Sequence, residues 1–321
     1  MLPAKQAALW HFALACLNQE IPAMILYVVE SIGSSPGRQG FFLVIDFAGY
    51  KEGSIGGGIM EHKFIELAKD YLRQNTPLNL LRRQVHDKDS PKDQSGMICS
   101  GEQTIWLYVL QQKDRSVIER LLTHPQNGCL EFSPDGMRFD TQPPDQNTFF
   151  QRNSDTSWVY REKTGYTHRL YIIGGGHVAL AFSRLMQTMD FHITLYDDRN
   201  SLDSFERNQY VQEKIALDDY SRLAQLIPGG PGSFVVVMTR GYRTDDLAIR
   251  ALWEKDFRYF GVLGSRAKIE KLLTGYRLEG IPEERIQKMR APAGLDIHSQ
   301  TPEEIAISIA AEIIRHRHDP V

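Results

Sequence analysis

The sequence predicts an α/β protein of two domains, in which an N-terminal α+β domain precedes a doubly wound parallel sheet. A strand–glycine–helix segment at residues 169–197 predicts the parallel sheet, and polar turn clusters at residues 133–168 separate it from the N-terminal strands and helices. A chain of 321 residues has enough apolar material for a core in each domain. We therefore expect domains at residues 1–130 and 168–321, joined by a hairpin-containing linker at 131–167.

Composition excludes several classes of protein. Apolar content of 42% and charged content of 24% are typical of a globular protein. A net charge of −3 and a pI near 6.4, without any basic tract, argue against nucleic-acid binding. No apolar run approaches the roughly 20 residues that span a bilayer, and the N-terminus lacks a signal-peptide profile. Three cysteines, Cys16, Cys99 and Cys129, are too few for a disulfide framework. We expect a cytoplasmic protein that contacts no membrane.

The N-terminal domain begins with a helix and continues with strands. Apolar periodicity predicts the helix and Pro22 ends it, while runs rich in Val, Ile and aromatic residues predict the strands. The expected elements are a helix at 4–19, strands at 23–30 and 41–47, a helix after Gly58, and strands at 78–85 and 103–110.

A glycine-rich loop precedes the second of these helices. Its sequence is Gly53-Ser-Ile-Gly-Gly-Gly-Ile-Met-Glu61. Three consecutive glycines, Gly56, Gly57 and Gly58, cost backbone entropy, but they allow N–H groups to surround an anion at a helix start. The turn between the first two strands adds candidate donors from Ser34, Ser35 and Arg38. A crowded turn between packed layers is the alternative. Glu61 would complement the helix dipole or accept hydrogen bonds from a ligand.

A cysteine lies in a turn just before the last strand of this domain, in Met97-Ile-Cys-Ser-Gly-Glu102. Small neighbours, including Gly101, would allow exposure of the Cys99 thiol, and a basic neighbour or a helix N-terminus would make it a thiolate. An inert buried thiol is the alternative. Cys16 and Cys129 have the sequence context of structural cysteines.

Residues 169–197 carry the pattern of a dinucleotide-binding turn. A buried strand leads into Gly174-Gly-Gly-His177, a helical pattern follows, and a second strand ends at Asp197. Gly174 permits the tight turn, and Gly176 lets the backbone approach a pyrophosphate. An acid about 20 residues further on can reach a ribose hydroxyl. Arg199 would contact a phosphate or pair with Asp198. A glycine turn that binds nothing is the alternative, because this Rossmann-like fold hosts many functions.

Two further strands, at 234–238 and 258–263, end in similar junctions. The second leads into Gly264-Ser-Arg-Ala-Lys268. In an open α/β sheet such junctions converge on one crevice, so cations there favour an anionic ligand. The candidate residues from this part of the chain are Gly174, Gly175, Gly176, His177, Asp197, Arg199, Gly264, Ser265, Arg266, Lys268 and Asp296. No His, Cys or Asp cluster has the spacing of a metal site, so we expect no metal ligands from side chains.

Together these stretches resemble the XdhC/CoxI family of accessory proteins for molybdenum hydroxylases, and the resemblance covers both domains. The segments that carry it are Gly33-Ser-Ser-Pro36, Gly53–Glu61, Cys99-Ser-Gly101, Ile173-Gly-Gly-Gly-His-Val178, Tyr196-Asp-Asp-Arg199, Gly261-Val-Leu-Gly-Ser-Arg-Ala-Lys268, Pro292-Ala-Gly-Leu-Asp-Ile297 and Thr301-Pro-Glu-Glu-Ile-Ala306.

The resemblance implies an N-terminal XdhC/CoxI-type domain and a cytoplasmic chaperone that has no turnover of its own. Such a protein binds molybdenum cofactor (molybdopterin), protects it during sulfuration by a cysteine desulfurase, and passes it to a hydroxylase such as xanthine dehydrogenase. Glycine nests would hold phosphate, Cys99 would lie near metal or sulfur, and the Rossmann-like crevice would take a nucleotide. Apolar helices at both ends of the chain favour a homodimer.

The chain departs from the family pattern at three places. Arg38 follows Pro36 one position later than usual, the cysteine turn is Cys-Ser-Gly, and Thr239 is followed by Arg240 where many members have His. This chain therefore has no histidine at that position to perform a His-dependent role. An NAD(P)-dependent oxidoreductase remains the alternative function.

Overall fold

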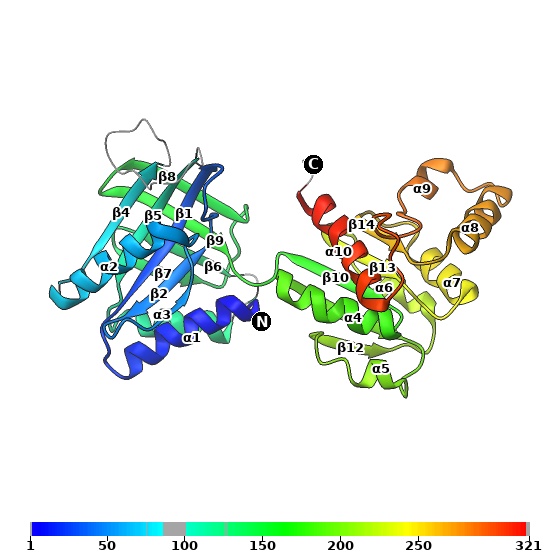
Figure 1. Ribbon diagram of the computed structural model, residues 1–321, viewed down its shortest axis with the longest axis horizontal. Coiled ribbons are helices and arrows are strands. Elements are labelled where there is room, and N and C mark those ends of the chain that lie inside the picture. Colours follow the sequence, from blue (N-terminus) through cyan, green and yellow to red (C-terminus); the bar gives the residue numbers. More distant parts are fainter. Residues whose placement is uncertain (1, 75, 86–100, 125, 127, 319–321) are drawn as a thin grey trace. The chain divides into compact units, whose positions relative to one another are not determined.

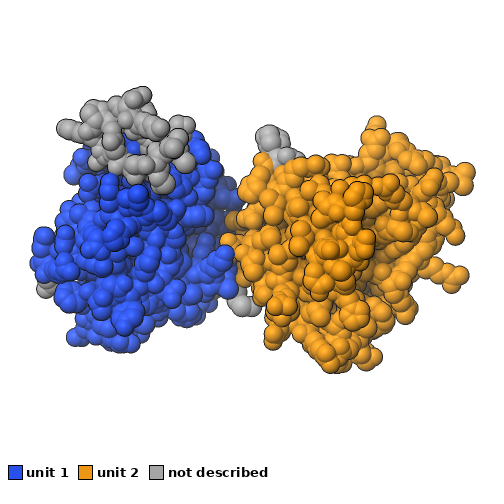
Figure 2. Space-filling model, in the orientation of Figure 1, with its two compact units in different colours: residues 1–165 blue, residues 166–321 orange. Residues whose placement is uncertain are grey.

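The computed structural model describes residues 2–74, 76–85, 101–124, 126 and 128–318. The chain divides into two units, Met1–Gly165 and Tyr166–Val321, which Figure 1 shows as ribbons and Figure 2 in separate colours. Residues 131–165, which the sequence assigned to the linker, belong to the first unit.

An antiparallel five-stranded sheet, with the order β3-β2-β1-β5-β4, forms the centre of unit 1. Its central strand β1 pairs Ala23 with Asp46 of β2 and Gly33 with Gly101 of β5. The strands are β1 (Ala23–Gly33), β2 (Phe42–Asp46), β3 (Lys51–Gly53), β4 (Asn79–Val85) and β5 (Gly101–Val109).

Side chains of β1 point alternately to the two faces of this sheet, and other elements cover both faces. Met24 and Leu26 pack beneath helix α2 (Gly58–Gln74). Ile25 and Tyr27 face the opposite core, together with helices α1 (Ala4–Asn18) and α3 (Asp114–Thr123). Because both faces are covered, every residue of Ala23–Val29 is buried.

A second antiparallel sheet, with the order β7-β6-β9-β8, covers part of that opposite face. The ring of Phe132 lies 4.2 Å from Trp106 of β5 in a stacked arrangement, so the two sheets share one aromatic core. These hairpins therefore pack as part of unit 1. The strands are β6 (Cys129–Ser133), β7 (Gly136–Asp140), β8 (Thr148–Ser154) and β9 (Ser157–Lys163).

Unit 2 is a parallel five-stranded sheet with the order β12-β11-β10-β13-β14. This order reverses direction at β10, as in a doubly wound Rossmann-like sheet, and it confirms the fold class predicted from the sequence. The strands are β10 (His168–Ile173), β11 (Phe191–Asp197), β12 (Glu213–Ala216), β13 (Gly230–Val237) and β14 (Phe257–Val262).

Helices cover both faces of the parallel sheet. One face packs against α4 (His177–Met186) and α10 (Pro302–His318), and the other against α6 (Leu223–Leu226), α7 (Tyr242–Leu252) and α8 (Arg266–Leu278). Shorter helices are α5 (Asp203–Glu206) and α9 (Glu283–Gln287), with 3₁₀ turns at Gln187–Met189 and Tyr220–Arg222. In the described part of the chain, no helix is long and apolar enough to cross a membrane.

Candidate functional site

Three loops of unit 1 contact one another, and glycines allow their backbones to approach closely. We call residues 33–38, 54–58 and 101 the loop cluster. A Cβ on Gly37 would lie 2.2 Å from the Ile55 carbonyl oxygen, and one on Gly101 would lie 2.5 Å from the Ser34 carbonyl carbon. Both distances are shorter than real contacts, so only glycine fits there. The candidate residues of the N-terminal domain that the structure describes thus lie together.

The glycine run forms a nest, as its composition suggests, and the chain fills this nest itself. Gly56, Gly57 and Gly58 all have positive φ, of 123°, 74° and 71°. Into their turn points the Glu61 carboxylate, whose Oε2 accepts hydrogen bonds from the N–H groups of Ile55 and Gly57, both at 3.0 Å. Two of the donors expected for an external anion therefore hold an internal one.

Two side chains complete the surroundings of Glu61. The Ser54 hydroxyl donates to Oε2 at 2.6 Å, and the Lys51 ammonium donates to Oε1 at 2.8 Å. Burial by itself would raise the pKa of Glu61, but these hydrogen bonds outweigh it and hold the pKa below its usual value. Glu61 is therefore ionised, and its carboxylate is occupied by contacts within the loop. The sequence pattern did not point to Lys51 as its partner.

Some donors of the loop cluster remain open. Ser34 and Arg38 are exposed, and Arg38 makes no ion pair among the described residues, since its guanidinium donates only to the Gly33 carbonyl at 3.0 Å. Ser35 is buried and its hydroxyl donates to the Gly37 carbonyl at 2.7 Å. Gly58 begins α2 at an exposed position, where the first N–H groups of a helix have no partner within the helix.

A buried glutamine, which the sequence did not suggest as a site residue, forms a hydrogen bond with the loop cluster. Gln103 is buried, and its side-chain oxygen accepts a hydrogen bond from the Gly37 N–H at 3.2 Å. Its amide nitrogen lies 3.2 Å from the sulfur of Met60. Cys99, two residues before Gly101, lies outside the described residues, so its predicted role stays a prediction.

In unit 2 the predicted glycine turn joins β10 to α4. Gly174 has a φ of 114°, and a Cβ there would lie 2.3 Å from the Met238 carbonyl oxygen. Among the residues that the structure describes, nothing lies within 4 Å of the Cβ position of Gly176, so the start of α4 faces open space, with exposed His177 as its first residue. This open helix start is the part of the turn that is accessible to a ligand.

Asp197 closes the turn from the inside. Its carboxylate is fully buried and accepts a hydrogen bond from the Gly175 N–H at 2.6 Å. Arg199 grips the same carboxylate with two N–H groups, both at 2.9 Å, and with its backbone N–H at 2.8 Å. Burial would raise the pKa of Asp197, but these hydrogen bonds lower it below its usual value. The structure therefore places Asp197 against the glycine turn, away from solvent, with Arg199 as its partner.

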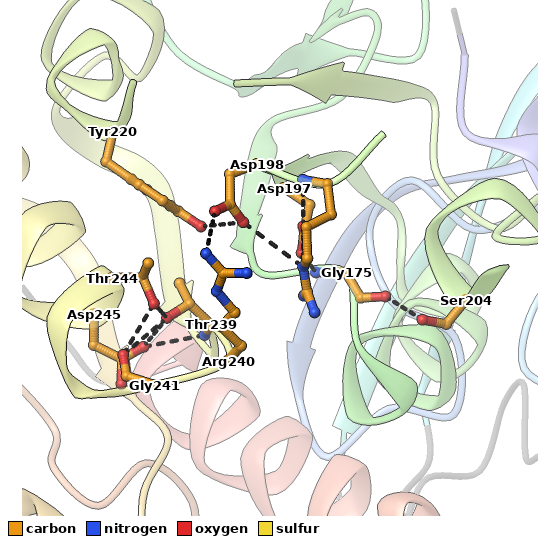
Figure 3. Close-up of polar contacts among 11 residues, drawn as sticks. Gly175, Asp197, Asp198, Ser204, Tyr220, Thr239, Arg240, Gly241, Thr244 and Asp245 are labelled. Atoms are coloured by element: carbon orange, nitrogen blue, oxygen red, sulfur yellow. Dashed lines mark hydrogen bonds and ion pairs between the residues drawn. The ribbon is translucent and has the colours of Figure 1, made fainter. Parts of the chain in front are cut away.

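The adjacent acid, Asp198, is the more accessible one. It accepts a hydrogen bond from the Tyr220 hydroxyl at 3.1 Å and one from Arg240 of the β13–α7 junction at 3.2 Å (Figure 3). Its side chain is 21% exposed, whereas that of Asp197 is 1% exposed. The sequence named Asp198 only as a partner of Arg199, and it did not suggest the contacts to Tyr220 and Arg240.

The neighbouring junctions lie at the same carboxyl edge of the sheet. At the end of β13, Thr239 donates its N–H to buried Asp245 at 3.1 Å, and the other carboxylate oxygen of Asp245 forms an ion pair with Lys268. Lys268 thus neutralises an internal charge. After β14, Gly264 packs against Lys268, and exposed Ser265 caps α8 by accepting the Lys268 N–H at 3.3 Å.

Arg266 and Asp296 also lie at this edge, as an exposed pair joined at 2.6 Å. The loop that carries Asp296 is tied to α10 because Glu312 accepts the Gly294 N–H at 2.7 Å. Among the residues that the structure describes, no group of three His, Cys, Asp or Glu side chains is arranged to hold a metal ion.

Comparison with known proteins assigns both units to one family. The model of the XdhC and CoxI family matches residues 16–83, and that of the XdhC Rossmann domain matches residues 170–313. The chain therefore belongs to the XdhC/CoxI family, as its motifs predicted.

Two curated relatives match nearly the whole chain. The uncharacterized protein YqeB of Escherichia coli is 26% identical over 93% of this chain, which spans only 44% of the length of YqeB. A protein of Bacillus subtilis, named as a probable subunit of xanthine dehydrogenase, is 22% identical over 94% of this chain and 96% of its own length.

A solved structure shares the fold. The crystal structure of a xanthine dehydrogenase from Bacillus halodurans matches with a TM-score of 0.70 and 22% identity, over 96% of this chain and 95% of that one. Identity at this level supports the fold alone.

Proposed function

We propose that this protein binds molybdenum cofactor and passes it to a molybdenum hydroxylase such as xanthine dehydrogenase. The observation that carries the proposal is the loop cluster, where the segment with exposed Ser34 and Arg38 packs closely against Gly56, two residues before α2 begins at Gly58. The family match over residues 16–83 includes these loops. Association with this cofactor is the property that the family match supports.

The donors that remain open suit an anionic, phosphate-bearing ligand. The cofactor is a pterin with a phosphate and a dithiolene-held metal, and it supplies the metal chemistry of the hydroxylase. Because Glu61 fills the glycine nest, the phosphate would be held by Arg38, Ser34 and the first N–H groups of α2. The task of this chain is to bind and shield the cofactor.

Sulfuration and delivery require partners. We place Cys99 beside the sulfur-accepting end of the cofactor, because it precedes Gly101 of the loop cluster by two residues. A cysteine desulfurase would supply the sulfur, and the hydroxylase would receive the finished cofactor. We expect this exchange in the cytoplasm, with the protein acting as a homodimer. Sedimentation of a monomer at micromolar concentration would contradict the dimer.

The parallel sheet of unit 2 supports a second possibility, an NAD(P)-dependent oxidoreductase, because nucleotides bind where strand order reverses. The buried position of Asp197 weakens it, since the acid expected to read the ribose is turned inward.

A paired titration tests the proposal. Purified full-length protein is titrated anaerobically with molybdenum cofactor released from a donor enzyme and, separately, with NAD(P)H. We expect micromolar or tighter cofactor binding, and Arg38→Ala should weaken it about tenfold by removing one charged contact. Arg73→Ala is the matched control, because Arg73 pairs with Asp70 at the far end of α2. Tight NAD(P)H binding without cofactor binding would refute the proposal.

A further inference from the structure

A basic cavity lies beside β14 of unit 2. It has a volume of about 260 Å³ and is lined by residues 257–260 of that strand and by residues 287, 288 and 290. Four cationic side chains line it: Lys255, Arg258, Lys288 and Arg290. Asp256 is the one carboxylate among the lining residues that the structure describes.

The backbone fixes the position of Arg290. β14 is an edge strand of the parallel sheet, and Arg290 forms a parallel bridge with Gly261 on the outer side of that strand. The Arg290 N–H donates to the Phe260 carbonyl at 2.8 Å, and the Val262 N–H donates to the Arg290 carbonyl at 2.9 Å. The guanidinium of Arg290 makes no ion pair among the described residues, so its N–H donors are open to a ligand.

Two of the other cations are held by carbonyl groups. Arg258 donates through Nε to the His316 carbonyl at the end of α10 at 2.7 Å. Lys255 donates to the carbonyls of Ala224 and Ile227. The carbonyl groups orient the Lys255 ammonium but carry no net charge, so its positive charge remains at the cavity.

The single carboxylate neutralises only part of this charge. Asp256 pairs with Lys288 at 2.5 Å, but both side chains are more than half exposed, so water screens the pair. Glu312 lies nearby on α10, where its carboxylate accepts the Tyr259 hydroxyl at 2.6 Å and the Gly294 N–H at 2.7 Å. Among the described residues that line the cavity, cationic side chains outnumber carboxylates by four to one, although the whole chain has a net charge of −3.

We propose that this cavity is a binding site for a small phosphate-bearing molecule, with Arg290 as its bidentate ligand. A guanidinium matches the geometry of a phosphate with two parallel N–H groups. The volume is below the roughly 300–1,000 Å³ of sites for larger ligands, so it suits inorganic phosphate or a small phosphorylated compound. This site is separate from the loop cluster and independent of the function proposed above.

The test is a calorimetric titration of the full-length protein at low salt with inorganic phosphate and, in a second series, with pyrophosphate. Saturable binding of one anion per chain is expected. Arg290→Ala should weaken it at least tenfold, and Arg290→Lys should restore it only in part, because an ammonium cannot bind in the bidentate manner. Arg285→Ala is the matched control, since exposed Arg285 lies on the neighbouring helix α9 and pairs with Glu254.

Amide NMR shifts locate the bound anion. Phosphate should perturb the amides of residues 257–260 and leave those of residues 176–178 at the glycine turn unchanged. A thermal melt of each variant checks that its fold is retained. Absence of saturable binding, equal affinity in Arg290→Ala, or perturbation of the glycine turn alone would each overturn the proposal.

Discussion

Replacing Asp197 by asparagine separates two roles for this residue. If Asp197 holds the glycine turn, the variant loses stability in unit 2, and if it reads the ribose of a nucleotide, the variant loses only binding. The structure favours the first, because the carboxylate is buried and receives the Gly175 N–H and both guanidinium contacts of Arg199.

The size of the loss follows from these contacts. Asparagine keeps one oxygen acceptor, but its amide group would face a donor, and the charge opposite Arg199 is gone. Breaking a buried ion pair costs about 3–5 kcal/mol. The Arg199 side chain is 31% exposed, so water recovers part of this, and we expect about 2–3 kcal/mol. For a unit of this size the melting temperature should fall by about 4–12 °C.

Urea denaturation and a thermal scan of the full-length protein measure this effect. Asp198→Asn is the matched control, because Asp198 is more exposed and its partner Arg240 is 57% exposed, so the control should cost less than about 1 kcal/mol. A variant at Asp197 with wild-type stability, or one less affected than the control, would refute the structural role of the carboxylate.

Three other predictions concern unit 1. Glu61→Gln should destabilise unit 1 by about 2 kcal/mol, because the donors of the nest lose a charged acceptor. Folding lowers the pKa of Glu61, so the wild-type protein should lose this extra stability as the pH falls through the carboxyl range. The free energies of unfolding of wild type and variant, measured from pH 7 to pH 3, should therefore converge at the acid end, and a constant difference would contradict the prediction. Gly37→Ala should cost about 1–3 kcal/mol through the clash with Ile55, while Gly176→Ala, which has open space around it, should cost less than about 1 kcal/mol; equal melting temperatures would contradict the close packing of the loops. Burial raises the pKa of Glu162, whose carboxyl contacts the hydroxyls of Tyr27 and Tyr160, so stability should decline as pH rises from the unfolded carboxyl value toward the folded one; Glu162→Gln should remove this slope in urea titrations, and an unchanged slope would assign it to other groups.

Strong local patterns allowed most of the fold to be predicted. The apolar run at residues 23–30 and the buried strand that leads into Gly174 each correspond to an observed strand. The hairpins at 131–165 were harder to place, because their aromatic residues pack on Trp106, which is distant in sequence. Local polarity indicates turns there but contains no information on which core the strands join.

At the candidate site, prediction from the sequence reached the backbone conformation but not the group that the N–H donors contact, and this is true of both units. Glycines predicted correctly where the backbone would adopt unusual conformations, at Gly56–Gly58 and at Gly174. They could not indicate which anion the N–H groups meet, because a carboxylate of the same chain competes with any ligand. Glu61 follows the glycines by only three residues and reaches back to Gly57, and Asp197 reaches Gly175 across a strand pair. A carboxylate of the same chain loses no translational entropy when it binds, so it excludes a free ligand wherever it can reach the N–H donors. A ligand of either glycine loop would therefore bind to the donors left over, which are Arg38 and Ser34 in unit 1 and the open start of α4 in unit 2.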